Sequence, residues 1–298
     1  MTAFDRRALM RGSVAALGAS LVGAPALAAP TRRNWKKAVK LGMVREGGSL
    51  LEKFQLLAEL GFDGVELDSP NGFDSAEVRD ARDQSGLPIH GVVDSRHWQK
   101  TLSHPDSAVR AEGVAALETA LRDAHAYGAS TVLLVPAVVN GDTSYEVAYQ
   151  RSQAEIRRVL PLAEELRVWI ALENVWNNFL LSPVEAARYV DEFESPWIGW
   201  YFDVGNIVRY GWPHHWVDAL GHRILKVDVK EYSRSKQMET GPWSGFDVPL
   251  LEGDCEWGRV AAALDRAGYD GWFTAEIAGG DRARLSEIAE RMDRILAS

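Results

Sequence analysis

Acidic residues end several apolar runs in this sequence, and carboxylates in such places could bind a metal ion. Glu173 ends VWIALE, Asp203 ends WYFD, Asp228 ends ILKVD and Glu276 ends GWFTAE. Carboxylates that converge repel one another and raise one another's pKa unless a cation lies between them. The four residues therefore predict a divalent metal site. A set of oxygen ligands favours Mn²⁺ or Mg²⁺ over zinc.

Two earlier runs also carry an acid at or near their ends, Glu66 in FDGVEL and Asp94 in LPIHGVVD. A single carboxylate in such a position is more often a solvated strand end or the N-cap of the next helix than a functional group. Glu66 is therefore a candidate for lining the same pocket as the four predicted ligands, with a structural role as the alternative.

The runs that carry these acids alternate with longer amphipathic segments. The apolar runs cover residues 38–44, 62–67, 87–94, 130–139, 168–174, 197–206, 224–230 and 271–277. Helical spacing of apolar residues marks segments 50–60, 114–128, 152–166, 182–193 and 258–268. Eight short strands, most of them followed by a helix, predict an α/β protein with a single (β/α)8 TIM barrel domain rather than an open sheet. The carboxyl ends of barrel strands meet at one mouth, which would bring the acids together.

The first 28 residues have the pattern of a targeting peptide that is removed from the mature protein. Arg6, Arg7 and Arg11 precede a mildly apolar stretch, and Ala26-Leu27-Ala28 resembles a cleavage site. A membrane anchor is the alternative, although the apolar stretch is shorter than the ~20 residues of a spanning helix. Paired arginines indicate a twin-arginine signal, and hence export of a folded protein to the periplasm.

The net charge limits which classes of partner are expected, and the cysteine content limits which disulfides can form. Removing residues 1–28 takes away three arginines and one aspartate, so the formal net charge of -9 becomes about -11. A surface this acidic argues against nucleic acid and anionic membranes as partners. Because Cys255 is the single cysteine, no intramolecular disulfide can form.

Several motifs carry a resemblance to a known family. They read LSHPDSAVRAEG, GASTVLLVP, ALENVWNNF, YFDVGN, VDVKEYSR, LEGDCEWGRV and GYDGWFTAEI. In order and spacing, over residues 38–296, the sequence resembles the xylose-isomerase-like TIM-barrel superfamily, which includes tagatose/psicose 3-epimerases and hydroxypyruvate isomerases. The resemblance implies one metal ion, usually Mn²⁺, held at the ends of strands five to eight. It also implies a small-molecule sugar substrate and a homodimer or homotetramer.

Carried over by position, the implied metal ligands are Glu173, Asp203, Asp228 and Glu276, and the two glutamates are also the implied proton-transfer groups. The sequence departs from the family pattern at Asp228, where relatives have histidine, and at Asn206, where many relatives also have histidine. Four carboxylates around one divalent ion leave excess negative charge, so we expect a cation nearby. Lys230 shares the strand parity of Asp228 and should point into the barrel.

Further residues are candidates for contact with a sugar. Arg234 lies six residues after Asp228, where sugar epimerases of the family carry an arginine that holds substrate oxygens. Tryptophans after several strands could form an aromatic wall, although a single tryptophan is more often part of a core. The predicted substrate-binding residues are Arg234, Lys230, Asn206, Glu66, His97, Trp98 and Trp176, and Trp212 and Trp243 are further candidates for the wall.

The resemblance implies a sugar isomerase or epimerase that works through an enediolate on a ketose or keto-sugar. Glu173 and Glu276 would remove and return the proton next to the carbonyl. A metal-dependent lyase or hydratase that cleaves keto-glycosides by β-elimination is one alternative, because the same enediolate can expel a leaving group. A sugar-binding barrel without turnover is the other alternative, and the aspartate at position 228 is its main support.

Overall fold

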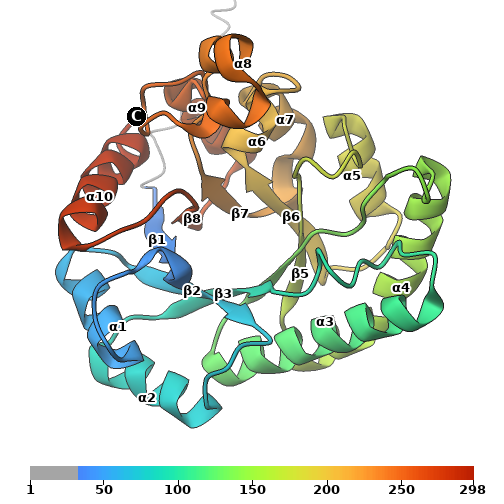
Figure 1. Cartoon of the computed structure of the whole chain (residues 1–298), viewed down its shortest axis with the longest axis horizontal. Coiled ribbons are helices and arrows are strands. Elements are labelled where there is room, and N and C mark those ends of the chain that lie inside the picture. Colours follow the sequence, from blue (N-terminus) through green and yellow to red (C-terminus); the bar gives the residue numbers. More distant parts are fainter. Residues whose placement is uncertain (1–32) are drawn as a thin grey trace, which may run out of the picture. The chain divides into compact units, whose positions relative to one another are not determined.

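The computed structural model describes residues 33–298, and the predicted signal peptide over residues 1–28 lies outside this part of the chain. Eight parallel strands follow one another around a closed barrel, and pairing of the first strand with the eighth closes it. The predicted (β/α)8 barrel is therefore confirmed, and Figure 1 shows the helices surrounding it. The strands are β1 Lys36–Lys40, β2 Gly64–Ser69, β3 Ile89–Asp94, β4 Thr131–Leu134, β5 Trp169–Glu173, β6 Ile198–Asp203, β7 Ile224–Val229 and β8 Trp272–Ala275.

The helices begin and end at residues suited to those positions. Ser49 and Glu52 form a capping box at the start of α1, and glycines with positive φ, Gly86 and Gly128, end α2 and α3. The α-helices are α1 Leu50–Glu59, α2 Ser75–Ser85, α3 Ser107–Tyr127, α4 Tyr145–Leu166, α5 Pro183–Asp191, α6 Val204–Val208, α7 Pro213–Leu220, α8 Arg234–Thr240, α9 Trp257–Ala267 and α10 Arg282–Leu296. Short 3-10 helices are η1 Leu41–Met43, η2 Gly221–Arg223 and η3 Pro242–Phe246.

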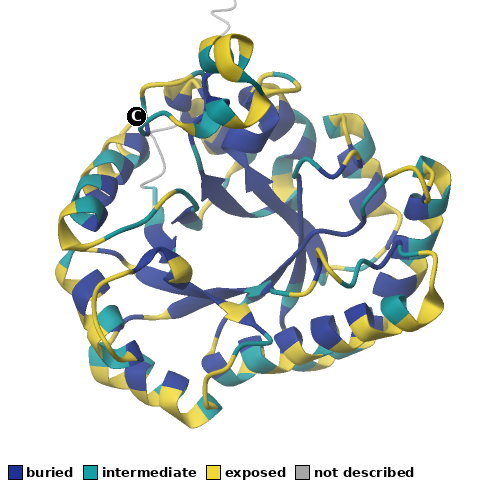
Figure 2. Ribbon diagram, in the orientation of Figure 1, coloured by how far each residue is buried: buried dark blue, intermediate teal, exposed yellow. Residues whose placement is uncertain are grey.

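Most of the apolar core lies between the barrel and its helices. Figure 2 shows the buried residues on the strands and on the helix faces turned toward them, with exposed residues on the outer faces. Phe54 of α1, Leu117 of α3, Val217 of α7 and Ile288 of α10 are fully buried in this layer. Within residues 33–298, no helix is both long and apolar enough to span a membrane.

The inside of the barrel is unusually polar. The hydroxyl of Tyr201 donates to Glu66 Oε1 at 3.0 Å and lies 2.9 Å from Thr274 Oγ1. Thr274 Oγ1 in turn lies 3.2 Å from His90 Nε2, and His90 Nδ1 lies 3.3 Å from Lys226 Nζ. Barrels of this class are usually filled with branched apolar side chains. Here a connected set of hydrogen bonds keeps the buried polar groups paired below the mouth of the barrel.

Candidate active site

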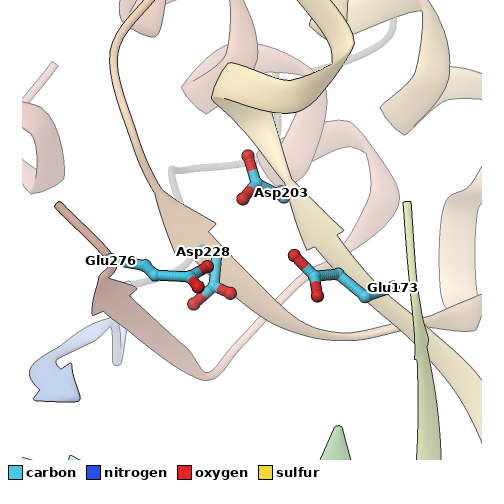
Figure 3. Close-up of side chains that lie close together, drawn as sticks. All are labelled: Glu173, Asp203, Asp228 and Glu276. Carbon is cyan, nitrogen blue, oxygen red and sulfur yellow. The ribbon is translucent and has the colours of Figure 1, made fainter. Parts of the chain in front are cut away.

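The four predicted ligands converge at the carboxyl ends of the strands. Glu173 ends β5, Asp203 ends β6, Asp228 lies next to the end of β7, and Glu276 follows β8. One carboxylate oxygen from each lies within 4.8 Å of the other three. Figure 3 shows the four side chains directed toward a common centre. The arrangement can therefore place four oxygen ligands around one ion.

Two asparagines hold the ends of β5 and β6 together. Asn174 accepts hydrogen bonds from the indole of Trp200 at 2.9 Å and from the backbone N–H of Asp203 at 3.3 Å. Asn206 donates its side-chain N–H to the carbonyl of Asn174 at 2.9 Å and to Glu173 Oε1 at 3.4 Å. The backbone N–H of Asn206 donates to Asp203 Oδ1 at 2.8 Å. Asn206 therefore contacts both of the first two predicted ligands.

Two lysines lie among the carboxylates. Lys230 Nζ is 2.8 Å from Asp203 Oδ2 and 2.9 Å from Glu276 Oε2, as the strand parity predicts for a side chain that points into the barrel. Lys40, at the end of β1, places its Nζ 3.0 Å from Asp228 Oδ2 and 3.1 Å from Glu276 Oε2. Sequence reasoning missed Lys40 because it followed only the acids. The signal was its position at the end of the first strand.

The charges and an unpaired oxygen of this cluster fit a divalent cation. If all are ionised, five carboxylates and two ammonium groups leave a net charge of -3, and one divalent ion would bring it to -1. Among the described residues, the buried Oδ1 atom of Asp228 has neither a hydrogen-bond donor nor an ion-pair partner, whereas Asp228 Oδ2, Asp203 Oδ2 and Glu276 Oε2 contact the lysine ammonium groups. A buried carboxylate oxygen without a partner fits a place for a cation. The carboxylates counted are Glu66, Glu173, Asp203, Asp228 and Glu276.

Burial and mutual repulsion shift the pKa values of these carboxyl groups. Burial, followed by the charge of Glu276, raises the pKa of Glu173 well above its usual value. Burial also raises the pKa of Asp228 well above its usual value, although Lys40 opposes the shift. Burial would raise the pKa of Glu276 as well, but Lys230 and Lys40 outweigh it and hold that pKa below its usual range. A bound divalent ion would stabilise the ionised form of every carboxylate that contacts it.

A cavity of about 360 Å³ opens above this cluster. Among the predicted residues, Glu173, Glu276, Asn206, Lys230, His97, Trp98 and Trp176 line it, and Lys40 and Trp243 line it as well. Asp203 and Asp228 are buried and are not among its lining residues. The structure therefore brings most of the predicted site together around one cavity.

Glu66, for which a place in the pocket and a structural role were both open, does not line the cavity, and neither does Asp94. β2 runs on to Ser69, so Glu66 lies inside the barrel, where its Oε2 is 3.7 Å from Lys40 Nζ and it does not line the cavity. Asp94 ends β3 and accepts a hydrogen bond from the backbone N–H of Arg96 at 2.9 Å. Its neighbour Val93 lines the cavity instead. An acidic residue at or near the end of an apolar run therefore does not always line the cavity at the mouth of the barrel.

Arg234 does not line the cavity. Its guanidinium donates to the carbonyl oxygens of Val208 at 3.2 Å and Gly211 at 2.6 Å, and lies 5.3 Å from the ring centre of Trp212. Trp212 is likewise absent from the cavity lining. A substrate role for Arg234 stays a prediction. It would require the guanidinium to break its hydrogen bonds to the carbonyl oxygens of Val208 and Gly211.

His97 presents a hydrogen-bond donor to the cavity. Its Nδ1 lies 3.3 Å from the backbone nitrogen of Val135, whose N–H can only donate, so Nδ1 is the acceptor. Burial lowers the pKa of His97 to about 3, so the ring is neutral near pH 7. A neutral imidazole with an acceptor at Nδ1 carries its proton on Nε2. The Nε2–H group is therefore free to bind an oxygen atom of a ligand.

Glu231 has a structural role that the sequence did not reveal. Its buried carboxylate accepts hydrogen bonds from the backbone of Leu251 at 2.7 Å and Cys255 at 3.1 Å, and from the indole of Trp257 at 3.1 Å. These bonds tie the long segment after β7 to the start of α9. Glu231 therefore fixes the segment that carries Trp243.

The chain matches one family model over most of its length. Residues 54–296 match the model described as xylose isomerase-like TIM barrel. Among curated proteins, the chain is 27% identical over 268 residues to L-ribulose-5-phosphate 3-epimerase UlaE of Escherichia coli O1:K1 / APEC. That alignment covers 81% of this chain and 88% of the relative.

Solved structures share the fold. A D-allulose 3-epimerase from Methylomonas sp. superimposes with a TM-score of 0.72 at 19% identity, covering 89% of this chain and 99% of that structure. The 3-keto-D-glucoside 4-epimerase YcjR from E. coli superimposes with a TM-score of 0.72 at 15% identity, covering 89% and 100%. At these identities the likeness extends to the barrel and not, by itself, to the reaction.

Proposed function

This chain belongs to the xylose isomerase-like TIM barrel family, and from that premise we propose that it is a metal-dependent sugar epimerase or isomerase that works through an enediolate. The observation that carries the proposal is the convergence of Glu173, Asp203, Asp228 and Glu276 within 4.8 Å of one another. The curated relative at 27% identity is named as a sugar-phosphate epimerase, and this supports the same class of reaction.

The four converging carboxylates would hold the ion, for which Mn²⁺ and Mg²⁺ are the candidates. When bound, the ion would polarise a carbonyl oxygen of the sugar and make the neighbouring carbon more acidic. Asp203 and Asp228 are fully buried and point at the cluster, so they can serve only as ligands or charge partners. Glu173 and Glu276 also line the cavity, and they alone among the four can reach a sugar.

Glu173 and Glu276 are therefore the proposed proton-transfer groups. They project from β5 and β8, which are separated by two strands around the barrel. One carboxylate would remove the proton next to the carbonyl, and the other would return a proton to the opposite face or to the neighbouring carbon. Return to the opposite face gives an epimer, and return to the neighbouring carbon gives an isomer.

Lys40 and Lys230 would balance the charge of the site. Lys40 contacts three carboxylates of the cluster and Lys230 contacts two, and both ammonium groups contact the same oxygen, Glu276 Oε2. Asn206 would hold Glu173 in place through its side-chain N–H. The Nε2–H group of His97 would bind a hydroxyl or carbonyl oxygen of the sugar.

A lyase acting on a keto-glycoside is the second candidate. Proton removal next to the carbonyl would be the same, and the enediolate would then expel the substituent at the β-carbon. The tryptophans Trp98, Trp176 and Trp243 along the cavity favour this candidate, because their aromatic faces could pack against the leaving sugar.

Two measurements test the proposal. The first is the content of divalent metal in the purified protein. The second is incorporation of deuterium from D2O into a panel of ketoses and 3-keto-glycosides. Metal-dependent incorporation next to the carbonyl would support enolisation, and the products would separate epimerase from lyase. Bound metal without incorporation on any sugar would favour a binding protein.

We also propose that the chain is exported to the periplasm by its twin-arginine-like N-terminus, on the basis of residues 1–28 alone. A homodimer or homotetramer, implied by the family resemblance, stays a prediction that sedimentation analysis would test.

A further inference from the structure

The cavity of the proposed active site has two halves of different chemistry. Carboxylates and ammonium groups form its inner half, and Trp98, Trp176 and Trp243 stand along the rest of its wall. The three tryptophans come from three separate parts of the chain: the connection after β3, the connection after β5, and η3. Trp98 is 48% exposed and Trp243 is 73% exposed, although both line the cavity. Exposed aromatic surface beside a polar site commonly marks a binding surface.

Trp176 and Trp243, two of the three tryptophans of this outer half, make specific contacts. The indole N–H of Trp176 donates to the carbonyl of Asn206 at 3.1 Å, and the guanidinium of Arg209 lies 4.5 Å from the ring centre. The rings of Trp176 and Trp243 lie 4.6 Å apart. The segment between β7 and α9 carries Trp243, and the hydrogen bonds of Glu231 to Leu251, Cys255 and Trp257 anchor its far end. Because Trp176 and Trp243 already pack against each other, a ligand would lose little free energy in bringing these two rings together.

The outer half does not suit a phosphate group. Among the described residues that line the cavity, only Lys40 and Lys230 are cationic, and both ammonium groups contact carboxylates of the inner half. His97 is neutral near pH 7 because burial lowers its pKa. A phosphate beyond the carboxylates would therefore meet mainly indole rings, because Arg209, whose guanidinium lies against Trp176, is not among the residues that line the cavity. A neutral group with hydroxyls and an apolar face matches this surface better.

We propose that Trp98, Trp176 and Trp243 form a subsite for a second, neutral sugar ring. The substrate would then be a ketose or keto-sugar joined to another pyranose, rather than a free or phosphorylated monosaccharide. The C–H face of the second ring would lie against an indole, and its hydroxyls would remain in water or reach His97. This inference rests on the proposed function for the inner half of the cavity.

Binding measurements on the Mn²⁺-loaded protein test the subsite. The probes are D-fructose and three disaccharides that add a glucose ring to it: turanose, maltulose and isomaltulose. We expect at least one disaccharide to bind about tenfold more tightly than D-fructose in isothermal titration calorimetry. Trp98→Ala and Trp243→Ala should each remove most of this gain, and so weaken disaccharide binding several-fold more than they weaken binding of D-fructose.

Two further variants serve as controls. Trp212→Ala removes a tryptophan that is 50% exposed but lies outside the cavity lining, and it should leave all affinities unchanged. Trp98→Phe keeps an aromatic face and should recover part of the gain, which separates stacking from a loss of folded protein.

Equal affinity for D-fructose and every disaccharide would overturn the subsite, as would absence of disaccharide binding or an equal loss for both kinds of sugar in the alanine variants. Deuterium incorporation tests the proposed function separately. Incorporation into D-fructose without a preference for disaccharides would overturn only the subsite. A preference for disaccharides without incorporation into any of the four sugars would support the subsite and count against enolisation.

Discussion

Lys40 Nζ lies 3.0 Å from Oδ2 of Asp228, and the two residues reach this contact from the first and seventh strands of the barrel. The family resemblance implies a neutral histidine where Asp228 stands. An aspartate paired with a lysine has the same total charge as a neutral histidine. The contact therefore accounts for how a charged ligand can occupy this position without adding to the net charge of the site.

Replacing Lys40 with methionine should destabilise the metal-free protein. Asp228 and Glu276 would each lose a close ammonium group, and an unpaired buried carboxylate costs about 3 kcal/mol or more. In a protein of this size that corresponds to a fall in Tm of roughly 5–10 °C. Saturating Mn²⁺ should remove much of the difference, because it supplies positive charge at the same place. An unchanged Tm without metal, measured by calorimetry, would show that Lys40 contributes no such pairing.

Replacing Glu173 or Glu276 with glutamine should lower the rate of deuterium incorporation by about 10²-fold to 10⁴-fold, because a positioned acid or base contributes about this much. The fold should be preserved in circular dichroism. Asp94→Asn is the matched control, since Asp94 also lies at the end of a strand but does not line the cavity, and asparagine can still accept the hydrogen bond from Arg96. Near-normal rates in both active-site variants would exclude the proposed proton-transfer roles.

Asp228→Ala should weaken Mn²⁺ binding at least tenfold, because one of four ligands is lost. Asp228→His should keep the Mn²⁺ affinity within a few-fold of that of the unaltered protein, since imidazole still supplies a ligand atom at the position where the family resemblance implies histidine. Titration of the metal against a competing chelator gives both values. If Asp228→Ala binds Mn²⁺ as tightly as the unaltered protein, Asp228 is not a ligand.

Ionisation of the buried Asp94 should lower the free energy of unfolding as the pH rises. Burial raises the pKa of Asp94 to about 7 in the folded chain, against about 3.8 in the unfolded chain. Between these values the folded state holds a proton that the unfolded state has lost, so stability falls with rising pH through this window, by at most about 4 kcal/mol. Asp94→Asn keeps an acceptor for the N–H of Arg96 and should raise the Tm at pH 8 but not at pH 4. An equal change at both values would contradict the shift.

Replacing Arg6 and Arg7 together with lysines should prevent export, because the twin-arginine route depends on this pair. The variant should remain in the cytoplasmic fraction with residues 1–28 attached. In the unaltered protein, mass spectrometry of the periplasmic fraction should find a chain that begins after Ala28. Export of the lysine variant at a normal level would indicate another route.

Much of the barrel and of its acidic site could be predicted from the sequence. Parallel strands in a barrel all point the same way, so acids at the carboxyl ends of neighbouring strands can meet at one mouth. This reasoning placed Glu173, Asp203, Asp228 and Glu276 correctly at one cluster.

Other parts could not be predicted, for physical reasons. The end of a strand depends on pairing with its neighbours, and β2 extends three residues beyond Glu66, which places that carboxylate inside the barrel. The contact of Lys40 with Asp228 joins residues distant in sequence, which no local pattern reveals. The hydrogen bonds of Arg234 to Val208 and Gly211 likewise depend on how two loops pack.

The pairing of β1 with β8 has a consequence for the order of folding. Lys40 enters with the first strand, and its partners Asp228 and Glu276 arrive with the last two. Contacts between residues so far apart in the sequence form late, because the entropy of closing such a long loop must first be overcome. Closing the ring and completing the ion cluster are therefore one event, and a chain that stops short of the eighth strand has neither.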